Sequence, residues 1–530
     1  MSQTRFNLAD LFSAVASAVP DRLALVAGDA RTSYAALEAR AERLASHLAA
    51  RGVKRGDTVG LLLYNGADYL ATFFAACKLG ALPVNINYRY VADELAYIFD
   101  NAKLSALVYD ASLAPAVEPL LSRFPTLHTA IATGDALETA LACAALPAPS
   151  EGRSGDDLML LYTGGTTGMP KGVMWPHAAL FFGALGGGDL YRRSGQPVAS
   201  AEELAGYAKG APALRFMPVA PMMHGAAMWA TLCALYAGQT VVCSDKLHFD
   251  ACHVLDVMAK EKVNISAIVG DAMAMPIRDA LEAHPGRWDL SAMYVFGSGG
   301  APIARHLQDA IKVYMPNAQM GNGYGTSEGG IIGQGPRPDG DGLMKLTLDA
   351  TLTVLTPDGR ARVAPGETGI LARSGHVPVG YWGDARKTAD TFIVLDGVRY
   401  ALLGDAARLE ADGRTATLLG RGSQCINTGG EKVFPEEVED VLRRHPDVTD
   451  ALVVGVADER WGQRVAAVVS LRRAPGREDA ALLAAHCRAH LAGYKIPRTI
   501  VFEAELSRSV AGKANYRWAR ERAEAAGATA

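Results

Sequence analysis

A short run rich in glycine and threonine carries the residues best suited to hold a polyanion. Between Leu160 and Trp175 the chain reads LLYTGGTTGMPKGVMW, with four glycines, three threonines and one lysine after an apolar stretch. Glycine loses more backbone entropy on ordering than any other residue, so this density of glycine needs a reason. Backbone N–H groups, threonine hydroxyls and the ammonium of Lys171 all bind phosphate oxygens well. The run therefore predicts a phosphate-binding loop.

The loop differs from the two commonest nucleotide-binding loops. A P-loop has Ser or Thr directly after its lysine, whereas Lys171 is followed by Gly172. The G-x-G-x-x-G fingerprint of dinucleotide-binding folds is also absent. Neither of the folds that carry those loops is therefore indicated.

A second group of candidate residues lies in GYGTSEGG (Gly323–Gly330). Its Gly325–Gly329 part matches the G-x-S-x-G elbow of serine hydrolases, in which Ser327 would be the nucleophile. That assignment requires a helix directly after Ser327. The residues that follow, GGIIGQGPRPDG, contain too many glycines and prolines to begin one. The hydrolase alternative is disfavoured for this reason.

The elements that must position these residues alternate along the first part of the chain. The pattern predicts helices over 34–52 and 67–80, and buried strands over 58–64 and 81–87. Helices and strands in alternation imply a parallel sheet covered by helices. Because the same rhythm returns further along the chain, we expect a large α/β body over residues 1–420.

Two segments depart from this alternation. The Gly- and Ala-rich stretch 186–212 is weakly patterned and is expected to form a mobile surface excursion. After 420 the pattern predicts a helix over 435–445, strands over 448–458 and 464–473, and a helix over 479–491. We therefore expect a small α+β domain over residues 425–530, joined to the body by a hinge at 421–424.

Length and composition limit the partners. The chain has 530 residues, 20% of them charged and 49% hydrophobic, which is ordinary globular composition. The formal net charge is −4 and the basic residues are scattered, which argues against a nucleic-acid partner. Seven cysteines are widely spaced and none forms a Cys-x-x-Cys pair, so neither a disulfide framework nor a zinc site is expected. These features favour the reducing cytoplasm.

The first patterned residues do not resemble a targeting signal. LADLFSAVASAVPDR (Leu8–Arg22) has apolar residues at helical spacing but carries Asp10 and Asp21, which predicts an amphipathic helix. No uncharged apolar run approaches the roughly 18–20 residues of a membrane span, so no transmembrane segment is expected. The sequence leaves peripheral membrane contact and a homodimer open.

Together the motifs resemble those of the adenylate-forming superfamily of acyl-CoA synthetases, luciferases and peptide-synthetase adenylation domains. TGGTTGMPKG looks like its signature loop. Further matches follow in chain order: PVAPMMHGAAMW (Pro218–Trp229), GSGGAPI (Gly297–Ile303), GYGTSEGG (Gly323–Gly330), GETGILARSG (Gly366–Gly375), GYWGD (Gly380–Asp384), LLGD (Leu402–Asp405), GRGSQCINTGGEKVFPEEVE (Gly420–Glu439) and AGKANYR (Ala511–Arg517). They extend over nearly the whole chain. The resemblance implies parallel-rich α/β sheets, a distorted β region and a small mobile C-terminal domain.

The resemblance also implies ATP, Mg²⁺ and coenzyme A as ligands. The residues that it assigns to the β- and γ-phosphates of ATP are Thr163, Gly164, Gly165, Thr166, Thr167, Gly168 and Lys171. Tyr324 and Gly325 would contact the nucleotide, with the Tyr324 ring against adenine. Thr326 and Ser327 would be catalytic, Ser327 near the α-phosphate, and Glu328 would bind Mg²⁺, a hard cation that prefers oxygen ligands.

Further residues complete the implied nucleotide site. Gly299, Gly300, Ala301 and Pro302 would border the adenine and the floor of the acyl pocket. Asp405 and Arg421 would contact the ribose hydroxyls as acceptor and donor. Lys513 would reach from the small domain to the substrate carboxylate and the α-phosphate during adenylation. In the second step the small domain would rotate, and Gly429 and Gly430 would line the pantetheine tunnel.

The acyl pocket has the fewest sequence signals. His224 matches the family position beside the acyl carboxyl group, and Met222, Met223 and Met228 lie near it in the chain. Methionine adapts to irregular apolar shapes, although core filling explains any single methionine equally well. The segment TGGTTGMPKGVMW resembles that of synthetases for fatty or steroid side-chain acids. We therefore expect a hydrophobic carboxylic acid as the substrate.

These inferences predict an AMP-forming acyl-CoA ligase. The acid would be activated as acyl-AMP with release of pyrophosphate, and the CoA thiolate would then displace AMP. Alternatives are transfer of the acyl group to a carrier-protein thiol, an aromatic acid as the substrate, and a nucleotide-binding protein without catalysis. The chain contains no recognisable carrier domain, which favours free CoA.

Overall fold

The computed structural model describes most of the chain, divided into two compact units. The described residues are 6–142, 152–165, 168–189, 194–335, 343–421, 426–428, 431–458, 462–491, 493–508 and 514–527. The larger unit comprises Met1–Gly333, Ser374–Val394 and Arg399–Ala401. The smaller unit comprises Gln334–Arg373, Leu395–Val398 and Leu402–Ala530. The predicted hinge at 421–424 falls mostly outside the described residues and stays a prediction.

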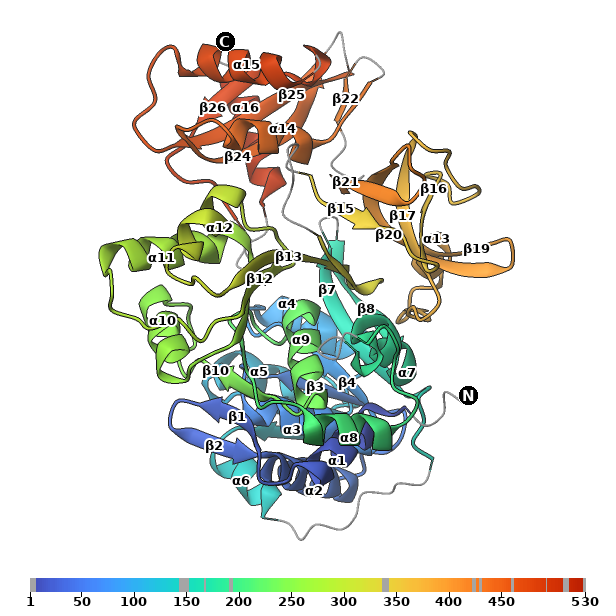
Figure 1. The fold of residues 1–530 in the computed structure, drawn as a ribbon. Coiled ribbons are helices and arrows are strands. Elements are labelled where there is room, and N and C mark those ends of the chain that lie inside the picture. The colour runs from blue at the N-terminus through green and yellow to red at the C-terminus, as the bar shows by residue number, and fades with distance from the viewer. Residues whose placement is uncertain are drawn as a thin grey trace. The chain divides into compact units, whose positions relative to one another are not determined.

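The larger unit contains a seven-stranded sheet in the order β18-β8-β7-β4-β3-β5-β6. Figure 1 labels four of its strands, β3, β4, β7 and β8. Its strands are β3 (Thr58–Leu62), β4 (Leu82–Asn85), β5 (Ala106–Tyr109), β6 (Thr129–Ala132), β7 (Leu158–Gly165), β8 (Gly168–Pro176) and β18 (Gly380–Tyr381). Strands β7, β4, β3, β5 and β6 are parallel, whereas β8 and β18 are added antiparallel. The accompanying helices are α2 (Tyr34–Ala50), α3 (Ala67–Lys78), α4 (Ala92–Asn101), α5 (Ala114–Leu121) and α6 (Asp135–Leu141). The predicted helix–strand alternation is confirmed.

A second sheet of the larger unit has eight strands in the order β14-β13-β12-β11-β9-β10-β1-β2. Its strands are β1 (Leu23–Ala27), β2 (Ala30–Ser33), β9 (Arg215–Pro218), β10 (Thr240–Cys243), β11 (Ile265–Ile268), β12 (Val295–Gly299), β13 (Gln319–Thr326) and β14 (Gly330–Gly335). The six strands from β13 to β1 are parallel. The accompanying helices are α9 (Gly225–Tyr236), α10 (Ala251–Lys260), α11 (Gly270–Ala283) and α12 (Arg305–Lys312). Strand β14 directly follows the turn at Ser327, so the helix that a hydrolase elbow requires is replaced by a strand.

The prediction of a surface excursion over 186–212 is wrong for its second half. Residues Ala201–Gly210 form helix α8, which packs against helix α1 (Leu8–Ala18), the predicted N-terminal helix (Figure 1). Ser200 caps α8, because its hydroxyl accepts a hydrogen bond from the N–H of Glu203 at 3.2 Å. Leu204 and Ala208 are fully buried. The cap followed by two glutamates was the signal for this helix.

The distorted β region, which was expected within the body of residues 1–420, is an antiparallel sheet that lies mostly in the smaller unit. Its order is β15-β21-β20-β17-β16, with β19 paired to β20. The strands are β15 (Lys345–Thr347), β16 (Leu352–Leu355), β17 (Thr368–Ser374), β19 (Phe392–Leu395), β20 (Val398–Leu409) and β21 (Thr415–Arg421). The register of β20 against β21 shifts between Ala406 and Ala407. A short helix, α13 (Ala385–Thr391), belongs to the larger unit.

The last part of the chain has the predicted α+β composition. The sheet order is β23-β22-β25-β24, with β26 paired to β25. Its elements are β22 (Ile426–Thr428), β23 (Glu431–Val433), α14 (Pro435–Arg443), β24 (Val448–Asp458), β25 (Gly462–Leu471), α15 (Asp479–His490), β26 (Thr499–Phe502) and α16 (Tyr516–Gly527). Helix α16 was not predicted from the sequence.

Strand β24 is buried on both faces. Ala451 and Val453 pack in a cluster with residues of α14 and α15, whereas Leu452 and Val454 pack in another with Ala519 of α16. Successive side chains of a strand point to opposite faces, so the unbroken apolar run follows from this double cover. Among the residues that the structure describes, no helix is both long and apolar enough to cross a membrane.

Candidate active site

The Gly/Thr loop forms the tip of the hairpin of β7 and β8. Thr163 pairs with Lys171 and Gly165 pairs with Gly168 across the two strands. Directly opposed residues of an antiparallel pair project from the same face, so the Thr163 hydroxyl and the Lys171 ammonium share one face of the hairpin. Gly164 lies within β7. Thr166 and Thr167 lie outside the described residues, and their phosphate-binding role stays a prediction.

Lys171 is paired with an acidic residue more than two hundred positions away. Its Nζ lies 3.1 Å from Oδ2 of Asp384 and 5.9 Å from the ring centroid of Tyr381. The side chain of Lys171 is 41% exposed and that of Asp384 is 35% exposed. The ammonium therefore remains accessible to another anion. The backbone N–H of Lys387 and the Lys171 ammonium hold the pKa of Asp384 below its ordinary value.

Glu328 lies in the turn between β13 and β14. The hydroxyl of Tyr381 donates a hydrogen bond to its Oε1 at 2.7 Å. Within the turn, the N–H of Gly329 donates to the hydroxyl of Thr326 at 2.8 Å, so buried Thr326 fixes the turn that carries Glu328. The carbonyl of Ser327 accepts from the indole of Trp175, on β8, at 2.8 Å. These contacts tie the GYGTSE turn to the hairpin strand.

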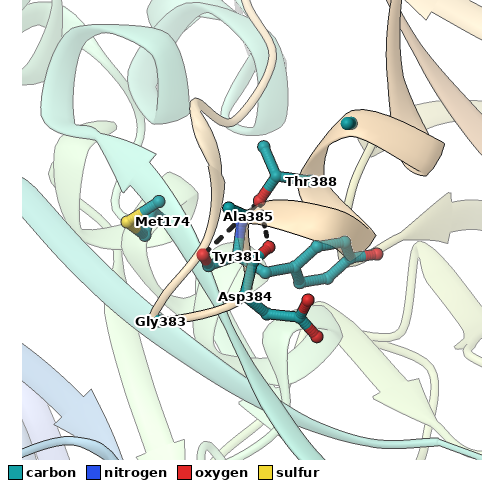
Figure 2. A pocket seen from close by; sticks show the side chains of 7 residues that line it. Met174, Tyr381, Gly383, Asp384, Ala385 and Thr388 are labelled. Carbon is teal, nitrogen blue, oxygen red and sulfur yellow. Dashed lines mark hydrogen bonds between the residues drawn. The ribbon is translucent and has the colours of Figure 1, made fainter.

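Tyr381 therefore connects the two charged groups that the sequence assigns to phosphate and magnesium. Figure 2 shows Tyr381 and Asp384 on one short segment, with the Thr388 hydroxyl bonded to the Tyr381 backbone. A pocket of about 600 Å³ opens beside them. It is lined by Met174, Tyr381, Gly383, Asp384, Ala385, Thr388 and Ala389. The carboxylate of Glu328 suits a hard cation, and the ammonium of Lys171 suits phosphate oxygens, so this cluster fits a magnesium–nucleotide.

The ends of β12 and β13 form a surface of bare backbone. Gly297 pairs with Gly321 and Gly299 with Gly323 along these parallel strands. A Cβ at Gly321 or at Gly300, which has φ +85°, would meet no atom within 4 Å. Only hydrogen is present where side chains would otherwise project, so a flat ring could lie against this surface. The predicted adenine-binding residues Gly299, Gly300, Ala301 and Pro302 belong to this region, and half-buried Tyr324 follows on β13.

Hydrogen bonds fix the loop after β12. The hydroxyl of Ser298 accepts from the N–H of Gly270 at 2.7 Å, and the side chain of Asn322 accepts from the N–H of Ile303 at 2.9 Å. Both side chains are buried. They were not predicted as site residues, although each lies within one of the quoted glycine-rich motifs or beside it.

His224 precedes α9 and lies near the same loop. A Cβ at Gly299 would be 3.4 Å from the Cβ of Ala226, in the first turn of α9. Met222, Met223 and Met228 are almost fully buried, and the Tyr69 hydroxyl donates to the Met222 carbonyl at 2.9 Å. These methionines fill the core in the structure. The role of His224 beside the acyl carboxyl group stays a prediction.

The remaining site residues lie in the smaller unit. Asp405 on β20 is directly opposite Arg421 on β21 and is 7% exposed. Strand register thus brings together the two residues assigned to the ribose. Lys513, Gly429 and Gly430 lie outside the described residues.

Comparison with known proteins identifies the family. Residues 12–382 match the AMP-binding enzyme family, and residues 437–513 match the AMP-binding enzyme C-terminal domain. The chain belongs to the AMP-binding enzyme family. The predicted adenylate-forming superfamily, and with it the prediction of an enzyme, is confirmed.

Similar proteins cover nearly the whole chain. A medium/long-chain fatty acid–CoA and 3-oxocholest-4-en-26-oate–CoA ligase of Mycobacterium marinum is 42% identical, over 98% of this chain and 97% of the relative. A 3-oxocholest-4-en-26-oate–CoA ligase of Rhodococcus rhodochrous is 40% identical, over 97% and 95%. Among solved structures, a Mycobacterium tuberculosis fatty acyl CoA synthetase has a TM-score of 0.71 at 27% identity, over 98% and 99%. The predicted fold class, a large α/β body followed by a smaller α+β domain, is confirmed.

Proposed function

We propose that this protein ligates a hydrophobic carboxylic acid, a fatty acid or a steroid side-chain acid, to coenzyme A through an acyl-AMP intermediate. The observation that supports the proposal most strongly is the arrangement around Tyr381. There the lysine of the Gly/Thr hairpin and the carboxylate of the GYGTSE turn, which are far apart in the sequence, lie within contact of one side chain. A triphosphate with its metal requires these two charges near each other.

In the first half-reaction, the substrate carboxylate attacks the α-phosphorus of ATP and pyrophosphate leaves. Lys171 binds the leaving phosphates, Ser327 lies near the α-phosphate, and Glu328 holds Mg²⁺. When bound there, Mg²⁺ would supply positive charge that offsets the charge of the phosphate oxygens. Asp405 and Arg421 orient the ribose, and the glycine surface of β12 and β13 receives the adenine. Lys513 compensates the charge that develops at the α-phosphate.

In the second half-reaction, the CoA thiolate attacks the acyl carbonyl and AMP leaves. One active site serves two transition states, so the small domain of residues 425–530 rotates about the hinge at 421–424 between the steps. Lys513 then leaves, and Gly429 and Gly430 line the passage for the pantetheine arm. His224 remains beside the acyl group in both steps.

The acyl substrate is proposed from the relatives, whose names specify medium- and long-chain fatty acids and a steroid side-chain acid.

We place the enzyme in the cytoplasm, because Cys77, Cys233 and Cys243 are buried free thiols. A homodimer is proposed as the assembly, and light scattering coupled to size exclusion tests it. No nucleic-acid partner is proposed for a chain of net charge −4.

The test is pyrophosphate release over a panel of short, medium, long, aromatic and steroid side-chain acids, with and without CoA. We expect turnover with medium- or long-chain acids or with the steroid acid, and sustained release of AMP only when CoA is present. An aromatic acid as the best substrate, or an acyl carrier protein as a better acceptor than CoA, would replace the proposal by that alternative. Nucleotide binding without pyrophosphate release from any acid would contradict it.

A further inference from the structure

The segment GYWGD, Gly380–Asp384, is held rigidly beside the hairpin that carries Lys171. As strand β18 it pairs with β8, with Tyr381 opposite Val173. The N–H of Trp382 donates to the Gly172 carbonyl at 2.8 Å, and the Trp382 indole donates to the Asn101 carbonyl at 3.1 Å. The segment is therefore fixed by main-chain and side-chain bonds within the larger unit, and its other side chains can act from a defined position.

Two side chains of this segment contact the two charged groups of the phosphate site. Tyr381 donates to Oε1 of Glu328 at 2.7 Å, and Asp384 accepts from Nζ of Lys171 at 3.1 Å. Asp384 is itself held in place, because its Oδ1 accepts from the N–H of Lys387 at 2.8 Å and so caps α13. The segment therefore restrains the orientation of both the Glu328 carboxylate and the Lys171 ammonium.

We propose that Tyr381 and Asp384 are positioning residues of the nucleotide site. Tyr381 orients the Glu328 carboxylate for magnesium, and Asp384 holds the Lys171 ammonium ready until phosphate oxygens displace it. The proposal rests on the proposed function, in which Lys171 binds phosphate and Glu328 binds the metal. It gives a role to the motif GYWGD, which has no part in the two half-reactions as described above.

The hydrogen bond to Glu328 acts by fixing a carboxylate that must bind a cation. Because Oε1 accepts the hydrogen bond of Tyr381, the Glu328 carboxylate is held in one orientation, in which it would bind Mg²⁺. Groups that orient a metal ligand commonly change metal affinity by about 10–100-fold when they are removed. The ring of Tyr381 is not needed for this effect, because the hydroxyl alone makes the bond.

Whereas the hydrogen bond of Tyr381 favours metal binding, the ion pair of Asp384 with Lys171 opposes nucleotide binding. The pair must be broken or shared when Lys171 binds a phosphate, so Asp384 competes with the nucleotide. Both side chains are more than a third exposed, which makes the pair weak and the exchange easy. The pair holds the ammonium 3.1 Å from Asp384 and 5.9 Å from the ring centroid of Tyr381.

The test for Tyr381 measures the affinity for Mg²⁺ of the full-length protein with ATP bound, by calorimetry, together with ATP affinity in EDTA. We expect Tyr381→Phe to weaken Mg²⁺ binding by about 10-fold and to leave ATP binding in EDTA unchanged. Tyr314→Phe, at a half-buried tyrosine outside the site, is the matched control. Unchanged Mg²⁺ affinity in a folded Tyr381→Phe protein, judged by an unchanged Tm, would overturn this part of the proposal.

A double-mutant cycle separates this proposal from the proposed function. Glu328→Gln removes the metal-binding charge, and adding Tyr381→Phe should then cause no further loss of Mg²⁺ affinity. An equal loss in both backgrounds would show that Tyr381 does not act through Glu328. If Glu328→Gln alone leaves Mg²⁺ affinity unchanged, the metal site of the proposed function is wrong.

The test for Asp384 uses asparagine, which still caps α13 but removes the charge. We expect Asp384→Asn to tighten ATP binding in EDTA by about 2–5-fold, since Lys171 no longer has to leave a partner. The gain should vanish in a Lys171→Met background. Unchanged or weaker binding by Asp384→Asn would overturn this part, and unchanged ATP binding by Lys171→Met alone would contradict the proposed function instead.

Discussion

Replacement of Lys513 by alanine is expected to slow acyl-adenylate formation by about 10²–10³-fold. The carboxylate attack places negative charge on the α-phosphate in the transition state, and a preorganised cation stabilises that charge most strongly where water is excluded. The second half-reaction does not use this cation, so thioester formation from supplied acyl adenylate should be unchanged. Single-turnover release of pyrophosphate and of AMP measures the two half-reactions separately.

Arg517→Ala is the matched control for this experiment. Arg517, four positions after Lys513 in the sequence, lies on α16, and its side chain is 91% exposed and pairs with Glu521 at 3.0 Å. Its removal should leave both half-reactions unchanged. Equal losses in the two half-reactions of Lys513→Ala would contradict the assignment, because they would indicate a general defect of the small domain.

Replacement of Asp450 by alanine is expected to destabilise the smaller unit by about 3–5 kcal/mol. Asp450 is 8% exposed and accepts from Nε of Arg443 and from Nε of Arg508, each at 3.1 Å. Removing the carboxylate would take away the counter-charge that the two mostly buried guanidinium groups share, and only the ion pair of Arg443 with Glu439 at 3.2 Å would still oppose the charge of Arg443. Urea unfolding followed by circular dichroism measures the loss, and Asp447→Ala, at a more exposed pair with Arg473, should change stability little.

The same carboxylate gives the stability a pH dependence. Burial raises the pKa of Asp450, but the charges of Arg443 and Arg508 outweigh it and leave the pKa below the ordinary value of 3.8. Its contribution is therefore fully present above pH 3.8 and is lost as the pH falls through the lower folded value. Acid unfolding of Asp450→Asn should depend less on pH in this range. An identical pH dependence of the two proteins would show that the ion cluster does not set acid stability.

The sequence predicted those parts of the fold that local patterns determine. The periodicity of α2 and α3 and the apolar runs of β3 and β4 are properties of short windows, so these elements lie where they were expected. Helix α8 was missed because Leu204 and Ala208 give it only a narrow apolar face. Its burial depends on α1, which lies almost two hundred residues earlier.

In the candidate site, too, the sequence predicted the residues of local motifs but not the contacts between distant ones. Lys171 and Glu328 could be named from their motifs, because glycine-rich surroundings and charge are visible in the sequence. Tyr381 and Asp384 could not be given a task, since Lys171 and Asp384 are separated by 213 positions and no local pattern encodes their pairing. Only the antiparallel addition of β18 to β8 brings them together.

The double cover of β24 has a practical consequence for shortened versions of the enzyme. Ala519 and Ala523 of α16 close one side of that sheet over Leu452 and Val454. A chain cut before Tyr516 would leave this side bare to water and prone to self-association. Helix α16 therefore covers the second hydrophobic cluster of this domain, and a fusion partner should be attached after α16 rather than in place of it.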